Sequence, residues 1–116
     1  IWAALDARKR EVYAASFEAT AAGPRRLTVD MVLAPEALAA RLDAGAVLVG
    51  DATETYGDVL GAPATVRPFA THHPRGGLIA RLGGERLRGG EVTDAGSLEP
   101  VYVRPPDAEL PLAGSR

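Results

Sequence analysis

The sequence predicts an α/β protein with a mixed sheet, which begins as a three-stranded antiparallel meander and continues as alternating helices and strands. Three observations support this prediction. Residues 1–33 hold three apolar stretches that are separated only by short polar segments. A helix-like segment follows at residues 35–45, and residues 46–49 (AVLV) form a continuous apolar run. Such a run is typical of a strand that is buried on both faces of a sheet.

The first two apolar stretches predict a hairpin. Residues 1–5 (IWAAL) and 11–19 (EVYAASFEA) are strand-like, and the polar residues 7–10 join them. Two strand-like runs with a short polar connection are typical of a β-hairpin. In the second run, alternate residues are apolar and should share one face of the sheet: Tyr13, Ala15, Phe17 and Ala19.

A third strand is predicted over residues 26–33, after a turn at residues 22–24 (AGP). Polar Thr28 and Asp30 should face away from the apolar side, as in a half-buried antiparallel strand. The apolar side of this strand should hold Leu27, Val29, Met31 and Leu33.

A helix is predicted to begin at Pro35 and to stop at Gly45. Proline suits the first helical position, Glu36 suits the positive N-terminal end, and glycine suits a helix stop. Leu38 and Leu42, four positions apart, give the segment an apolar stripe.

The second half of the chain predicts shorter elements. Residues 53–60 predict a short helix with Tyr56 and Leu60 on one side, and residues 65–66 predict a short strand between two prolines. A single domain is predicted over residues 1–104, with a last extended piece at residues 101–103 (VYV). Residues 105–116, with three prolines, predict a poorly ordered tail.

A last helix is predicted over residues 74–88, although four glycines lower its helix propensity by about 1 kcal/mol each relative to alanine. In a helix, Gly77, Ala80 and Gly84 would form a face of small residues that permits close packing. The resulting order of elements is the order of a ribonuclease H-like fold.

Composition limits the class of protein. The chain has 116 residues, the size of one domain, and 47% of them are apolar. It has no cysteine, which excludes disulfides and thiolate metal sites and fits a reducing cytoplasm. No apolar run approaches the roughly 20 residues of a membrane span, so we expect no membrane contact. The start at Ile1, inside an apolar stretch, suggests a fragment or a processed product.

The net charge is −2, whereas a chain that binds nucleic acid by itself is usually clearly basic. The candidate site lies at the tip of the predicted hairpin. Asp6 ends the first strand, and Arg8, Lys9 and Arg10 follow it. A tight turn with cations suits a phosphate or a partner contact. The alternative is an ordinary solvated hairpin tip, which the spacing alone favours.

Two other patterns could bind metal. His72 and His73 are adjacent, so their side chains point in different directions and rarely bind one ion. Asp6, Asp30 and Asp51 could be imagined as the carboxylate cluster of a metal-dependent nuclease. We predict no metal site and no catalytic residue. The alternative function is a metal-dependent hydrolase, either a nuclease or a peptidase.

Four segments together resemble the C-terminal half of the TsaB/YeaZ family. They are LDARKREVY at residues 5–13, LAPEAL at 33–38, VLVGDATETY at 47–56 and LEPVYVR at 98–104. This resemblance implies half of an actin/hexokinase-type fold, in which two ribonuclease H-like halves face each other. The N-terminal domain of the family is absent from this sequence.

The resemblance also implies a role. Such proteins are non-catalytic partners of TsaD, with TsaE as a further partner, in bacterial synthesis of threonylcarbamoyladenosine beside the tRNA anticodon. ATP and Mg²⁺ belong to the parent complex rather than to this chain, and tRNA would be met only indirectly. A homodimer would form through the missing half. The metal-binding histidine pair of TsaD is absent here.

In this superfamily the turn after the first strand approaches nucleotide phosphates. Carried over, this implies Asp6, Arg8, Lys9 and Arg10 here, while the adenosine side is implied at Gly50 and Asp51. Arg10 and Ala52 stand where the family usually has glycine, which weakens the case for a nucleotide cradle. Arg tolerates a positive φ poorly. These departures favour a structural role or a partner contact at the turn.

Overall fold

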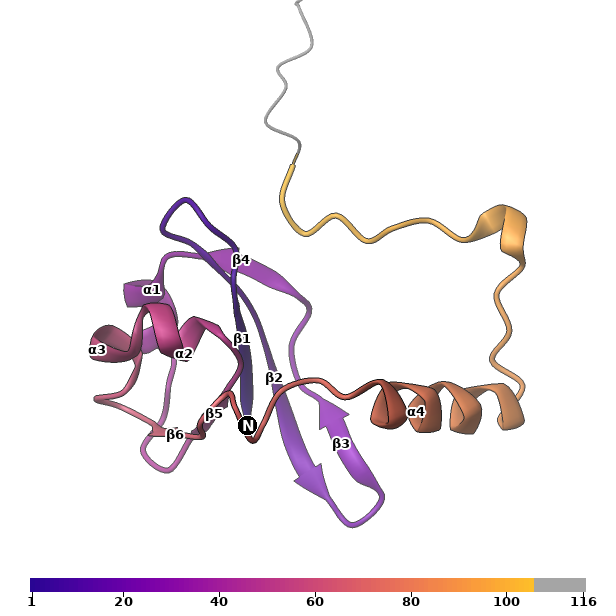
Figure 1. The fold of residues 1–116 in the computed structure, drawn as a ribbon, viewed down its shortest axis with the longest axis horizontal. Helices are drawn as coiled ribbons and strands as arrows, with labels where there is room; N and C mark the ends of the chain where they lie inside the picture. Colours follow the sequence, from indigo (N-terminus) through magenta and orange to yellow (C-terminus); the bar gives the residue numbers. More distant parts are fainter. Residues whose placement is uncertain (106–116) are drawn as a thin grey trace, which may run out of the picture.

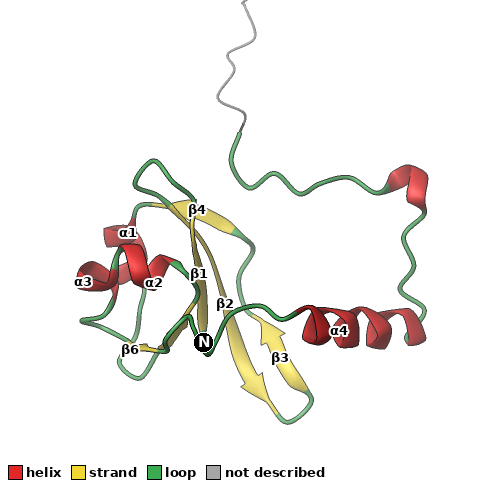
Figure 2. Ribbon diagram, viewed as in Figure 1, coloured by secondary structure: helices red, strands yellow, loops and turns green. Residues whose placement is uncertain are grey.

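The computed structural model describes residues 1–105 and consists of a mixed sheet, three short helices on one face and a longer helix that stands off the sheet (Figure 1). Figure 2 separates these helices, strands and loops by colour. The strands are β1 (Trp2–Asp6), β2 (Val12–Thr20), β3 (Gly23–Arg26), β4 (Met31–Leu33), β5 (Val47–Val49) and β6 (Thr65–Val66). The helices are α1 (Pro35–Ala39), α2 (Ala52–Thr55), α3 (Gly57–Leu60) and α4 (Gly76–Arg88), with a 3₁₀ turn, η1, at Ala95–Ser97.

The strand order is β3-β2-β1-β5-β6, with β4 also paired to β2. β1 is antiparallel to β2 and parallel to β5, and β5 is parallel to β6. The predicted mixed sheet, antiparallel at its start and parallel afterwards, is therefore confirmed. The prediction of a poorly ordered tail falls almost entirely on residues 106–116, which lie outside the described part of the chain.

The hairpin of β1 and β2 is confirmed, with Ala4 opposite Ala14 and Leu5 opposite Tyr13. Its two faces differ. The Ala4 and Ala14 side chains are buried in the core under the short helices. The opposite face, which we call the open face, carries the predicted apolar row of β2. Together with residues 101–104 it lines a cavity of about 440 Å³, whose strand residues include Ala3, Leu5, Tyr13, Ala15 and Phe17.

The third strand is not continuous, so the prediction over residues 26–33 was wrong in its middle. Residues 27–30 separate β3 from β4 and stand opposite only residues 15 and 16 of β2. The Thr28 hydroxyl interrupts the ladder, because it accepts a hydrogen bond from the Ser16 N–H at 2.8 Å. Extra residues on one strand make a bulge. As a result, Leu27 and Val29 are exposed and do not reach the core.

The helix predicted from Pro35 begins there but ends near Ala39 rather than at Gly45. After α1 the backbone N–H groups of Arg41 and Leu42 donate three residues back, which tightens the chain into turns. Gly45 has a φ of 90° and makes the turn into β5. The short helix predicted at residues 53–60 is present as α2 and α3, which Tyr56 separates with a φ of −123°.

The core lies between the sheet and helices α1, α2 and α3. Figure 1 shows these helices gathered over the β1–β5–β6 side of the sheet. Its fully buried large side chains are Val12, Leu38, Leu48 and Leu60. Each comes from a different element, so the core ties β2, α1, β5 and α3 together.

Helix α4 confirms the helix predicted over residues 74–88, but it has no buried residue. The close packing expected from its small-residue face is absent. A Cβ atom at Gly77 would meet nothing within 4 Å, and one at Gly84 would meet only the Arg88 side chain of the same helix. Residues 101–103 form no strand. In the described part of the chain, no helix is long and apolar enough to cross a membrane.

We call residues 76–104 the arm. No residue between 76 and 102 is buried, and eight large apolar side chains there are exposed. Figure 1 shows α4 pointing away from the sheet and the following chain returning toward the turn between β1 and β2. The exposed apolar residues of the arm are Leu78, Ile79, Leu82, Leu87, Val92, Leu98, Val101 and Tyr102.

Candidate functional site

The turn between β1 and β2 consists of three consecutive left-handed residues. Arg8, Lys9 and Arg10 have φ angles of 60°, 54° and 60°. None of them is glycine, and a left-handed conformation costs a residue with a Cβ atom roughly 1–2 kcal/mol. Backbone strain of this kind concentrates at functional sites, where the surrounding structure holds it. The turn therefore needs support from its neighbours.

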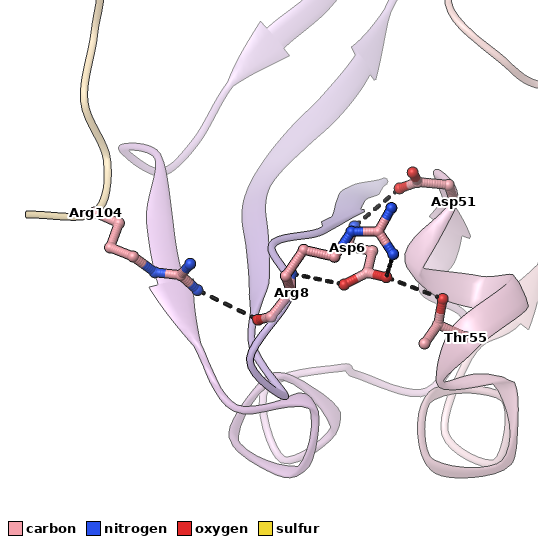
Figure 3. Close-up of polar contacts among 5 residues, drawn as sticks. All are labelled: Asp6, Arg8, Asp51, Thr55 and Arg104. Atoms are coloured by element: carbon pink, nitrogen blue, oxygen red, sulfur yellow. Dashed lines mark hydrogen bonds and ion pairs between the residues drawn. The ribbon is translucent and has the colours of Figure 1, made fainter. Parts of the chain in front are cut away.

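Asp6 supplies part of this support. Its carboxylate accepts the Arg8 backbone N–H at 2.8 Å and the Thr55 hydroxyl at 3.2 Å (Figure 3). The Arg8 guanidinium also reaches the carboxylate, at 3.4 Å. Only 9% of the Asp6 side chain is exposed, against 86% of the Arg8 side chain. The carboxylate is thus turned inward, where it joins the turn to α2, while the cation lies in solvent.

Gly50 and Asp51 bring the loop after β5 against the end of β1. A carboxylate oxygen of Asp51, Oδ1, accepts the Asp6 backbone N–H at 2.9 Å (Figure 3). Gly50 has a φ of 116°, and a Cβ atom there would lie 1.9 Å from the carbonyl oxygen of Ala4. Glycine is needed for this close approach of two backbones. The two predicted halves of the site, the turn and the loop, are therefore brought together.

Arg104 reaches the turn from the far end of the chain. Its guanidinium donates to the Arg8 carbonyl oxygen at 3.3 Å and forms a charged hydrogen bond with the Glu11 carboxylate (Figure 3 draws the first of these). The guanidinium also lies 5.7 Å from the centre of the Tyr13 ring, within the range of a cation–π interaction. Only 18% of the Arg104 side chain is exposed.

At this site the basic side chains of the turn lie in solvent, whereas the Asp6 carboxylate is largely buried. Arg8, Lys9 and Arg10 are all exposed on one turn. An exposed group of cations on a fixed backbone suits a phosphate or an acidic protein surface. Of the three aspartates of the nuclease alternative, Asp6 and Asp51 are joined through the Asp6 backbone N–H and the Asp51 carboxylate, whereas the Asp30 carboxylate pairs with Arg26 at 2.7 Å. Among residues 1–105, no three His, Cys, Asp or Glu side chains are placed to hold a metal ion.

Sequence reasoning missed two residues of the site. Thr55 is the last residue of the short helix α2, and no local sequence pattern marks it. Its hydrogen bond to Asp6 depends on how α2 packs against β1. Arg104 lies 96 residues from Arg8. The only signal for it was its place in the segment LEPVYVR, which carried the family resemblance without assigning a role to the arginine.

No protein-family model matches the sequence, and a comparison with curated proteins gives no match. Solved structures do match. The chain is similar to one half of YeaZ. YeaZ from Pseudomonas aeruginosa is 26% identical with a TM-score of 0.72, over 87% of this chain and 48% of that chain.

A second solved structure gives the same result. It is described as an uncharacterized protein with similarity to peptidase YEAZ from Pseudomonas aeruginosa, and it is 28% identical with a TM-score of 0.72. The match covers 89% of this chain and 48% of the other, so the chain spans about half the length of the YeaZ structures it matches. The predicted resemblance is confirmed at this level, and the mixed sheet matches half of the actin-like fold of YeaZ.

Proposed function

We propose that this chain provides one half of a non-catalytic subunit in the synthesis of threonylcarbamoyladenosine in tRNA, where it acts with TsaD and TsaE. The observation that carries the proposal is the structural similarity to half of YeaZ at 26–28% identity. In this role TsaD carries the catalytic residues, and ATP and Mg²⁺ belong to the complex. A net charge of −2 supports an indirect relation to tRNA.

Within this role, the turn of Arg8, Lys9 and Arg10 is proposed to contact a phosphate or an acidic surface of the complex. Support comes from the exposure of all three cations and from the hydrogen-bonded backbone under them. Arg10 keeps the left-handed φ that the family's glycine would allow without strain.

The arm is proposed to pack against a second domain, which corresponds to the part of YeaZ that this chain does not match. The eight large apolar side chains exposed along this one segment support this, because apolar side chains concentrated at a surface mark interaction sites. Residues 1–75 are about two thirds of the chain, so a match over 89% of it includes part of the arm. The family resemblance also implies a homodimer, formed through this second domain.

Reconstitution of tRNA modification tests the role. TsaD, TsaE, tRNA and the threonylcarbamoyl donor are combined with or without the full-length protein that contains this chain, and modified adenosine is measured by mass spectrometry of nucleosides. We expect modification to depend on the protein, and a pull-down to recover TsaD with it. Arg8→Gln should weaken the effect. Arg25→Gln should not, because Arg25 is an exposed arginine of β3 that pairs with Glu18, far along β2 from the turn. Full modification without the protein would contradict the proposal.

The alternative function, a metal-dependent hydrolase, predicts a different result. Purified protein alone would then turn over a nucleic acid or peptide substrate in the presence of Mg²⁺ or Zn²⁺. Replacing Asp6 or Asp51, which are joined by a hydrogen bond from the Asp6 backbone N–H to the Asp51 carboxylate, would abolish this turnover. Such an outcome would favour an enzyme over a partner subunit.

A further inference from the structure

The turn between β1 and β2 adopts a conformation that its own residues do not favour. Three successive left-handed residues with Cβ atoms are disfavoured. Inside the turn, two hydrogen bonds close the loop: Ala7 N–H to the Glu11 carbonyl oxygen and Glu11 N–H to the Arg8 carbonyl oxygen, each 3.0 Å long. Further support has to come from outside the turn.

Arg104 provides contacts from outside at both ends of the turn. One is to the Arg8 carbonyl oxygen, at the first left-handed residue, and the other is to the side chain of Glu11, just after the last. A guanidinium has several donors in a rigid plane, so it can bridge two acceptors at fixed positions. The Tyr13 ring next to it lies on the open face of β2. A low exposure of 18% strengthens these charged contacts relative to a surface pair.

We propose that Arg104 is a positioning residue, which holds the Arg8–Arg10 turn in its left-handed conformation when residues 101–104 lie on the open face. The arm would then control the shape of the candidate site, because Arg104 is the residue by which the arm reaches the turn. Displacement of the arm would release the turn to ordinary conformations and move its three cations. What the turn contacts rests on the proposed function, whereas its dependence on Arg104 does not.

Amide hydrogen exchange of the full 116-residue chain tests this dependence. The reporters are the Ala7 and Glu11 amides, which donate the two hydrogen bonds inside the turn. In Arg104→Gln we expect these amides to exchange roughly tenfold faster, the range expected for loss of a charged hydrogen bond. The control is Arg81→Gln, since Arg81 is an exposed arginine of the same arm that pairs with Glu85. Exchange in this control should stay at the level of the unmodified chain.

A rescue variant separates positioning from general support. Glycine accepts a left-handed φ without strain, so Arg10→Gly should restore much of the protection when it is added to Arg104→Gln. Unchanged exchange of the turn amides in Arg104→Gln would overturn the proposal. So would an equal increase throughout β1 and β2, or a double variant without recovery. Exchange is measured on the chain alone, so this result is independent of whether TsaD binds.

Discussion

Gly50 lies so close to Ala4 that a Cβ atom on Gly50 would stand 1.9 Å from the Ala4 carbonyl oxygen. Ala4 cannot move away, because it is fully buried and pairs with Ala14 in the centre of the hairpin. The approach allows the next residue, Asp51, to accept the Asp6 backbone N–H. The contact therefore belongs both to the core and to the candidate site.

Gly50→Ala should destabilise the protein by more than about 3 kcal/mol, because it combines a backbone clash with a φ that alanine rarely adopts. Urea unfolding followed by circular dichroism measures the change. Gly77→Ala is the matched control, since nothing lies within 4 Å of its added methyl group. In a helix this control should be neutral or stabilising, by up to about 1 kcal/mol. Equal midpoints for the two variants would contradict the contact.

Arg10→Gly should raise the free energy of unfolding by up to about 1 kcal/mol, because relief of the left-handed strain exceeds the entropy that glycine loses on folding. Thermal unfolding at constant pH measures this shift. Arg25→Gly in β3 serves as the control and should destabilise, since Arg25 has no such strain to relieve and glycine weakens a strand. A lower melting temperature of Arg10→Gly would contradict the strain assigned to this turn, because the entropy of glycine would then outweigh the relief.

The sequence predicted the hairpin correctly because its signal is local: two apolar runs with a short polar connection. It also placed Tyr13 and Phe17 on one face, as observed. It could not tell which face the helices would cover, since that choice depends on elements that follow later in the chain. The split between β3 and β4 escaped for a different reason. There the Thr28 hydroxyl, rather than a backbone carbonyl, accepts the Ser16 N–H. The alternation of apolar residues does not indicate such a side-chain contact.

The site was predictable only in part. Asp6 and the three basic residues stand out locally. Asp51 was considered first for a carboxylate cluster, and the family resemblance then placed it beside the turn. Their geometry was not predictable, because a left-handed turn of Arg-Lys-Arg contradicts intrinsic preference and depends on tertiary contacts. Arg104 shows the limit most clearly, because no pattern in the sequence relates it to a carbonyl group 96 positions earlier.

Asp6→Ala should destabilise the protein by about 1–3 kcal/mol, since it leaves the donors that bind the carboxylate without their acceptor. Thr55→Val removes one of these donors and should cost about 1 kcal/mol or less. Once Asp6 is alanine, the Thr55 change should have almost no further effect, because the shared hydrogen bond is already lost. Urea unfolding of the two single variants and the double variant gives this coupling. Strictly additive changes would mean that Asp6 and Thr55 do not interact.

Truncation of Leu38 and of Leu82 compares the stability that the core and the arm each contribute to the described chain. Leu38→Ala should destabilise by about 2–5 kcal/mol, because Leu38 is fully buried between α1 and the sheet and its truncation leaves a cavity. Leu82→Ala removes the same atoms from a side chain that is 41% exposed on α4. Its effect on urea unfolding should be within about 0.5 kcal/mol, as for other surface positions.

The same pair of leucines separates stability from interaction. If the arm packs against a second domain, Leu82→Ala should weaken that association in the full-length protein while the chain itself stays folded. Leu38→Ala should lower both the stability of the chain and the association, because a damaged core destabilises the sheet that carries the arm. A large loss of stability in Leu82→Ala of the chain alone would instead mean that Leu82 packs onto Phe17 of the open face, with which it already lines one cavity.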